Sequence, residues 1–411
     1  MKRIRKKARK ITYFLWLLLI SLCILVGSSI SDASRVSVVG QAEELQTEET
    51  KETAEELLDE NVREQLEKLD LSALEEYLET LDGFQDTDVK DRLLAYIQGA
   101  EIDYENFAKD LLKIFLSDVG ELIPAFACIA AISLISGLIS MMKSNATGKT
   151  STEVIFLVTY AASLIPLIAI LTECFTASIR CVSEMSKQMH IIFPLMLTLL
   201  SASGGAVSAA VCRPAVGFFA TTIVSVIQSV IFPLTILIIA FSMASNLTKE
   251  LKINKFTQFF KSINKWIIGV CISVFGLFFT LQGITAASYD GVVRRAAKYA
   301  IGNGIPIVGG FLSGGFDLAV AGSVLIKNSL GSMGIFLMLS TLFQPLILLV
   351  SVNILLRLVA AVTQPFGDSR ISDFLGETAD NLHFCTAGVL FIAFLYFLSI
   401  VIMICCTEAL F

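Results

Sequence analysis

The chain contains several apolar runs of 18 residues or more, and these runs restrict its fold more than any other feature. A run of that length can cross the hydrocarbon core of a bilayer as a helix. Lipid offers no hydrogen-bond partners, so a spanning segment must satisfy its own backbone groups, as only helices and closed barrels do. Strands of a membrane barrel alternate over roughly ten residues, and these runs do not alternate. The sequence therefore predicts an all-α, polytopic helical membrane protein.

Charge is divided between two parts of the chain. Residues 43–121 hold 25 acidic and seven basic side chains, whereas the remainder holds 12 acidic and 24 basic ones. We interpret residues 43–120 as an exported acidic helical region. Its narrow apolar stripe at helical spacing fits a solvated helical hairpin or a docking surface for another exported protein. Outside the membrane part no basic patch with interleaved aromatic residues occurs, so no nucleic-acid partner is predicted.

The N-terminus has the layout of a secretory signal peptide, which we assign to residues 1–42. Seven of the first ten residues are lysine or arginine, and the apolar run Ile11–Val26 and a stretch rich in small residues follow. An uncleaved anchor is the alternative. In both cases the acidic region is exported.

A segment that occurs twice predicts an internal duplication. Residues 193–205 and 305–315 each contain a proline followed by a Ser-Gly-Gly triplet. Two proline pairs are 112 residues apart, Pro194 with Pro306 and Pro233 with Pro345. Repeated units with Gly-interrupted apolar segments are common in transport proteins. The predicted organisation is a first transmembrane helix and loop at 121–153, membrane units at 154–265 and 266–383, and a last transmembrane helix at 384–411.

The glycines of these triplets are candidate break points, because each glycine lowers helix propensity by about 1 kcal/mol. A re-entrant segment would make each unit cross twice, with both copies in one orientation. A straight, closely packed helix would make each unit cross three times, with inverted copies. Counting Lys and Arg favours the re-entrant arrangement by a small margin. The glycine and proline candidates for a path or for packing are Gly204, Gly205, Gly309, Gly314, Gly315 and Pro306.

Two ionisable residues of the second Gly-rich segment, Asp317 and Lys327, are further candidates for a path. Ionisable groups at membrane depth are unfavourable and often mark ion or substrate routes. Snorkelling to an interface is the alternative. Asn353 and Arg357, on the following apolar run, are weaker candidates for a path. We interpret residues 172–190 as an amphipathic stretch and residues 363–382 as a polar linker.

Enzyme chemistry finds no support in the sequence. It contains no phosphate-binding Gly loop with a lysine, no metal-ligand spacing and no nucleophile with a nearby base. We therefore predict a non-enzymatic protein without a cofactor or metal. A stand-alone secondary transporter and a structural membrane scaffold remain alternatives to a subunit of a larger assembly.

Several strings of the second unit resemble the stage III sporulation protein AE family. They are Ala297–Gly302, Ile305–Gly309, Ile326–Gly331 and Thr363–Asp368, and Leu66–Glu75 near the N-terminus fits the same family. The resemblance runs from the signal peptide to the last helix, and the first unit matches more loosely.

This resemblance implies a multi-pass protein of the mother-cell membrane around the forespore, with its N-terminal region in the intermembrane space. The family acts in a channel, or feeding-tube apparatus, that supports forespore development and late gene expression. The expected partners are other stage III sporulation A proteins, including the ATPase AA and the ring protein AH, and indirectly stage II sporulation protein Q. Membrane lipid is a further expected partner. Whether the chain forms a homo-oligomer is left open by the sequence.

Overall fold

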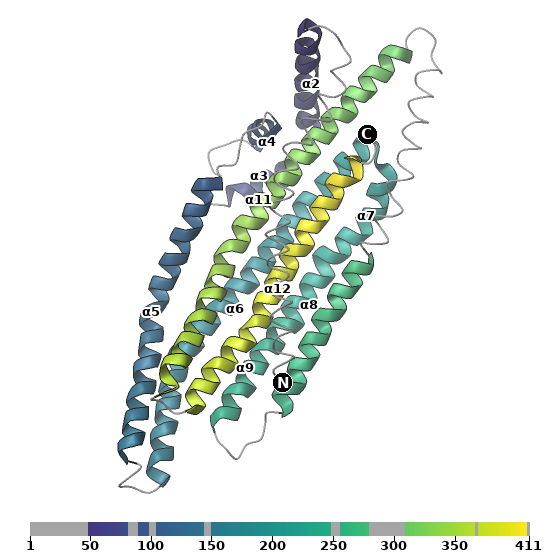
Figure 1. Ribbon diagram of the computed structural model, residues 1–411. Coiled ribbons are helices and arrows are strands. Elements are labelled where there is room, and N and C mark those ends of the chain that lie inside the picture. Colours follow the sequence, from purple (N-terminus) through teal and green to yellow (C-terminus); the bar gives the residue numbers. More distant parts are fainter. Residues whose placement is uncertain are drawn as a thin grey trace.

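The structure is a computed structural model that describes residues 48–80, 89–97, 104–143, 149–247, 255–278, 309–365 and 369–408. Within these ranges every regular element is a helix (Figure 1). The all-α prediction is therefore confirmed. The predicted signal peptide and Pro306 lie outside the described residues.

Three short helices precede a bundle of long ones. The short helices are α2 (Glu48–Lys68), α3 (Ser72–Glu79) and α4 (Val89–Ile97). Two long helices follow, α5 (Tyr104–Lys143) and α6 (Lys149–Ala202). One rod then consists of α7 (Ala206–Phe218), the π turn η1 (Phe219–Ile223), α8 (Val224–Val226), the π turn η2 (Ile227–Ile231) and α9 (Phe232–Leu247). The last three are the helix Lys255–Phe278, α11 (Gly309–Thr363) and α12 (Ser369–Glu408).

In the described part of the chain, six helical segments are long and apolar enough to cross a membrane. They are Val119–Ile139, Glu153–Ala202, Ala206–Leu247, Lys255–Phe278, Asp317–Thr363 and Arg370–Cys405. This finding agrees with a multi-pass membrane protein. α6 has 54 residues and α11 has 55. At 1.5 Å per residue each is roughly 80 Å long, well over the ~30 Å of a hydrocarbon core. Both helices therefore continue beyond a bilayer.

The long helices run up and down beside one another (Figure 1). The start of α6 contacts both the end of α9 and the start of α12. Arg370 pairs with Glu153 at 3.5 Å, and the Tyr160 hydroxyl donates to the Met243 carbonyl at 2.7 Å. We call this end of the bundle the basic end, because Lys143, Lys149, Lys255 and Arg370 are the helix-terminal cations there. This order of helices is the one expected if each unit crosses twice, and the duplication itself stays a prediction.

At the first glycine pair, where the sequence allows a break or a straight helix, the helix breaks. α6 ends at Ala202, and Gly204 adopts φ 92°, a left-handed conformation that favours glycine. The Gly205 N–H donates to the Leu200 carbonyl at 2.9 Å, and the Gly204 N–H donates to the Ser201 carbonyl at 3.2 Å. These two bonds form a Schellman C-cap, which satisfies the last carbonyls of α6. The chain then returns along α6 as α7 (Figure 1).

At the second glycine pair the helix does not break, which agrees with the alternative of a straight helix there. Gly314 and Gly315 lie inside the continuous helix α11, which begins at Gly309. Two glycines weaken a helix by about 2 kcal/mol. Breaking the helix would expose several backbone groups that need new partners. Gly204 and Gly205 cap α6, whereas Gly314 and Gly315 continue α11, so the Ser-Gly-Gly triplet alone does not decide whether a helix ends.

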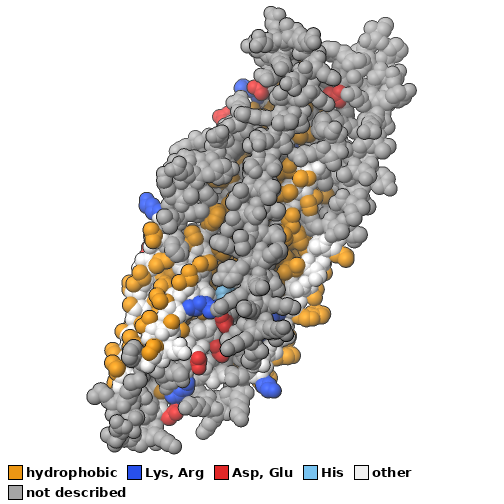
Figure 2. Space-filling view, viewed as in Figure 1, with side chains coloured by type: hydrophobic (Ala, Val, Ile, Leu, Met, Phe, Trp, Pro, Cys, Tyr) orange, Lys and Arg blue, Asp and Glu red, His pale blue; other side chains and the backbone are white. Residues whose placement is uncertain are grey.

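α12 lies at the centre of the bundle between α6, α9 and α11 (Figure 1). Its side chains Phe391, Tyr396 and Phe397 are fully buried. Large exposed apolar side chains occur instead on α5, the first half of α6, α9, the helix Lys255–Phe278 and the end of α11. Figure 2 shows apolar side chains over the flanks of the bundle, between its two ends. These flanks are the surface that lipid would cover.

Candidate functional site

The structure gives Lys327 the geometry of a helix-capping residue. Its side chain is fully buried, and its Nζ donates to the carbonyls of Met403 and Ile404, both at 3.0 Å. These carbonyls belong to the last turns of α12, where a cation interacts favourably with the helix dipole. Asp317 is half-buried and lies ten residues earlier on α11, roughly 15 Å along the axis. Asp317 and Lys327 therefore do not form a pair. Gly309, Gly314 and Gly315 lie in the first turns of the same helix.

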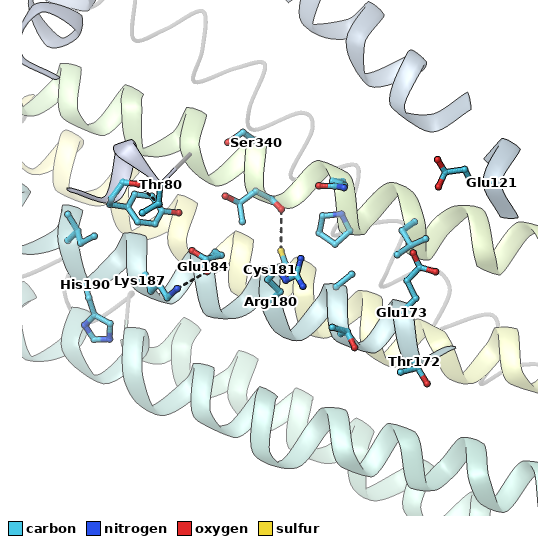
Figure 3. A pocket seen from close by; sticks show the side chains of 18 of the residues that line it. Thr80, Glu121, Thr172, Glu173, Arg180, Cys181, Glu184, Lys187, His190 and Ser340 are labelled. Atoms are coloured by element: carbon cyan, nitrogen blue, oxygen red, sulfur yellow. Dashed lines mark hydrogen bonds and ion pairs between the residues drawn. The ribbon is translucent and has the colours of Figure 1, made fainter. Parts of the chain in front are cut away.

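A groove of about 1530 Å³ lies between α3, α5, α6 and α11 (Figure 3). One wall comes from the predicted exported region and the others from helices that continue into the membrane span. Its charged lining residues are Glu76, Glu121, Glu173, Arg180, Glu184, Lys187 and His190. Lys187 pairs with Glu184 at 2.8 Å. Sites between structural units commonly have this form, a cleft with a few convergent polar groups.

The amphipathic pattern of residues 172–190 explains why α6 supplies most of this lining. Glu173, Arg180, Glu184 and Lys187 recur at helical spacing and face the groove (Figure 3). On the neighbouring face of the helix, Cys174, Cys181 and Gln188 are seven residues apart and are all buried. A glutamine on the apolar face of an amphipathic helix needs buried partners. This pattern is the sequence signal that identifies Gln188, which the sequence analysis missed.

Gln188 joins three helices through one amide group. Its Nε2 donates to the Tyr77 hydroxyl of α3 at 2.9 Å and to Thr341 Oγ1 of α11 at 2.8 Å. Gln188 itself is fully buried. Burial raises the pKa of the Tyr77 hydroxyl, which keeps it neutral and able to take part in this network. We call Gln188 with Tyr77 and Thr341 the Gln188 clamp; it fixes α3 against α6 and α11.

Beside the clamp, Pro345 frees a backbone carbonyl that α6 then contacts. Proline has no N–H, so the carbonyl of Thr341, four residues earlier, loses its helical donor. The Cys181 thiol donates to this carbonyl at 3.5 Å (Figure 3). The thiol therefore compensates a local defect of α11. This contact explains why a cysteine is useful here without any redox role.

The other short helices pack on the half of α11 that is distant from the basic end. Gln65 of α2 donates to the Ala319 carbonyl at 2.9 Å and accepts from Ser323 Oγ at 2.8 Å. A Cβ added to Gly322 would lie 2.8 Å from Asn61 Oδ1, so a larger residue there would displace the side chains of α2. Ser329 donates to the Leu93 carbonyl of α4 at 3.0 Å. α11 is therefore shared by the N-terminal helices and the membrane bundle.

A second polar cluster lies on α11 and α12, within two of the candidate membrane spans. Arg357 contacts Asp380 at 2.7 Å, Asn353 Oδ1 at 2.9 Å and His383 Nε2 at 3.1 Å. Asn353 in turn donates to the Ala379 carbonyl at 2.6 Å. We call Asn353, Arg357, Asp380 and His383 the Arg357 cluster. Ionisable groups at such depth pair with one another or face a water-filled cavity.

Arg357 and Asn353 are candidates from the sequence, whereas their partners Asp380 and His383 are not. The polar linker predicted at residues 363–382 is largely helical, because α12 begins at Ser369 and carries Asp380 inside the helix. The connection between the end of α11 at Thr363 and the start of α12 at Ser369 is therefore shorter than predicted. Within the described residues, no group of three or more His, Cys, Asp and Glu side chains is placed to hold a metal ion.

Comparison with known proteins identifies the family. The family model for stage III sporulation protein AE matches residues 87–407, well over half of the chain. The stage III sporulation protein AE of Bacillus subtilis strain 168 is 25% identical over 392 residues, which cover 95% of this chain and 97% of that protein. No solved structure matches. The matched residues 87–407 include the Arg357 cluster and the parts of the groove that α5, α6 and α11 supply. Because the match covers well over half of the chain, the chain belongs to the stage III sporulation protein AE family.

Proposed function

We propose that this protein is a non-enzymatic, integral membrane subunit of the channel apparatus between mother cell and forespore. In this role it supports forespore development and late gene expression. Membership of the stage III sporulation protein AE family supports a role in sporulation. The six apolar helices support a place within a membrane.

The observation that carries the proposal is the attachment of the N-terminal helices to the membrane bundle. The Gln188 clamp holds α3, and Gln65 with Ser323 holds α2, so both helices pack against α11 or α6. A subunit that connects exported partners to a membrane needs such a rigid junction. A carrier that works alone has no need of an exported domain built into its transmembrane helices.

The orientation follows from charge. Lys143, Lys149, Lys255 and Arg370 at the basic end support its location in the mother-cell cytoplasm. α2 carries mainly acidic residues at the opposite end of the bundle, and we place it in the intermembrane space. The groove then opens on the exported side or near that surface of the membrane.

This orientation assigns a side of the membrane to each proposed partner. The ring protein AH and, indirectly, stage II sporulation protein Q would meet the region of α2–α4. The ATPase AA would meet the basic end. The groove offers both signs of charge to a partner segment, with four carboxylates and three basic side chains.

The proposal is tested in the endospore-forming bacterium that carries this chain. Deletion should abolish heat-resistant spores, and the wild-type gene should restore them. Gln188→Leu should lower spore yield and reduce co-purification of the other stage III sporulation A proteins, while the chain still accumulates in the membrane. Thr198→Val, an exposed position on the same helix, is the matched control. Normal spore yield after deletion would overturn the proposal.

A stand-alone secondary transporter is the second candidate, and the Arg357 cluster is the observation that favours it. The pair Arg357→Gln with Asp380→Asn removes both charges at once. A transporter should lose function while its assembly with other proteins is unchanged. A scaffold should keep both. Replacement of Lys327 is unsuitable for this purpose, because it would remove the cap of α12.

A further inference from the structure

A small pocket of about 320 Å³ lies between α6 and α7. Its lining includes no residue of α3 or α11, which form walls of the groove. Its apolar lining includes Met189, Phe193 and Leu197 on α6 and Val216 on α7. Gly217 leaves this space open, because a Cβ added there would meet nothing within 4 Å. The two helices are antiparallel partners joined at Gly204, so the pocket is a gap in one hairpin.

Two basic side chains line the same pocket. Arg213 of α7 and His190 of α6 are both exposed. Among the described residues neither forms a hydrogen bond or ion pair. An arginine in apolar surroundings gains strongly from a charge-assisted contact with phosphate. The pocket therefore combines an apolar wall with unneutralised donors for an anion.

The surroundings of the pocket belong to a membrane span. The segment Ala206–Leu247 is one of the six candidate spans. Phe218, which follows the lining residue Gly217 in the chain, exposes 44% of its surface. Exposed side chains of this size fit a lipid-facing surface. The pocket thus lies between two helices that are candidate membrane spans, where a lipid is an available ligand.

We propose that this pocket binds an anionic phospholipid. Part of one acyl chain lies against Met189, Phe193 and Val216, and the headgroup phosphate lies beside Arg213 and His190. Basic pockets between membrane helices are a recurrent form of anionic lipid site. The pocket ends at Ala220 in the π turn η1, whose carbonyl accepts from Ser186 at 3.1 Å. The lipid therefore fills the α6–α7 hairpin next to its irregular backbone. This site does not depend on the proposed channel role.

The test uses native mass spectrometry of the full chain in detergent, with phosphatidylglycerol or phosphatidylcholine added. The wild-type chain should retain phosphatidylglycerol in preference to phosphatidylcholine. Gly217→Leu should lose the bound lipid, because its side chain occupies the pocket. Arg213→Gln should bind phosphatidylglycerol roughly tenfold more weakly and lose the preference, since it removes a charge-assisted contact. Gly269→Leu is the matched control, because its added Cβ also meets nothing within 4 Å.

Three outcomes would overturn the proposal. The first is equal retention of lipid by the wild type, Gly217→Leu and Gly269→Leu. The second is displacement of the lipid by inorganic phosphate, which would show an anion site without lipid specificity. The third comes from a photoactivatable phosphatidylglycerol on the wild-type chain, which needs no variant to fold. Its adducts should map to residues 189–198 or 213–220, and adducts found only elsewhere contradict the site.

Discussion

Replacing Gln188 by leucine should release α3 from the bundle while the membrane core stays folded. Gln188 is fully buried and donates to Tyr77 and Thr341 at 2.9 and 2.8 Å. Each such bond contributes about 0.5–1.5 kcal/mol net, and partners left unpaired in a buried site cost about 1–3 kcal/mol. Gln188 Oε1 has no hydrogen-bond partner among the described residues, so its removal offsets part of this loss. We expect a net loss of about 2 kcal/mol in the docking of α3.

That loss corresponds to a roughly thirtyfold rise in the open population of α3, at tenfold per 1.4 kcal/mol. Hydrogen exchange with mass spectrometry measures it directly. Amides of residues 72–80 should exchange faster in Gln188→Leu, whereas those of the buried helix α12 should not change. Tyr77→Phe removes one of the two bonds and should give a smaller effect. Unchanged exchange across α3 in Gln188→Leu would refute the clamp.

Three further substitutions test other contacts through unfolding in detergent. Lys327→Met should lower the free energy of unfolding by about 1–3 kcal/mol, because two α12 carbonyls lose a charged donor, and an unchanged midpoint would contradict the cap. Gly204→Ala should lower it by about 1–2 kcal/mol, since φ 92° places its Cβ in a strained conformation; Gly217→Ala is the control at an open helical site. Arg357→Leu should destabilise the chain by about 1–3 kcal/mol, less than a fully buried pair because both partners are partly exposed, and adding Asp380→Leu should restore part of the loss. A double variant less stable than Arg357→Leu would show that the pair does not account for the effect.

The helical membrane class could be predicted because it depends on a local property, the length of the apolar runs. At the two glycine pairs the sequence allows both a break and a straight helix. It could not show that α6 ends at Gly204 whereas α11 continues through Gly314, because the two triplets are alike in sequence. Their surroundings differ, since α2 packs on the later part of α11 through Gln65 and Ala319. Long-range packing of this kind is not visible in a single segment.

The candidate site was predicted less completely than the fold. Lys327 could be selected because it is a charge in an apolar run, but its partners are backbone carbonyls about 76 residues away, which no side-chain pattern indicates. Asp380 was missed because the polar stretch around it suggested a linker. Gln188 was not a candidate because the charged residues of 172–190 define the amphipathic pattern, and Gln188 lies on the buried face beside them. Only the arrangement of α3, α6 and α11 shows what that face contacts.

We propose that the basic end lies in the mother-cell cytoplasm and that the N-terminal helices lie across the membrane from it. Reporter insertions measure this most directly in sporulating cells, at residues 248–254 near the basic end and at residues 81–88 between α3 and α4. A reporter that is active only in the cytoplasm should be active at 248–254 and inactive at 81–88. Activity at 81–88 with none at 248–254 would contradict the account.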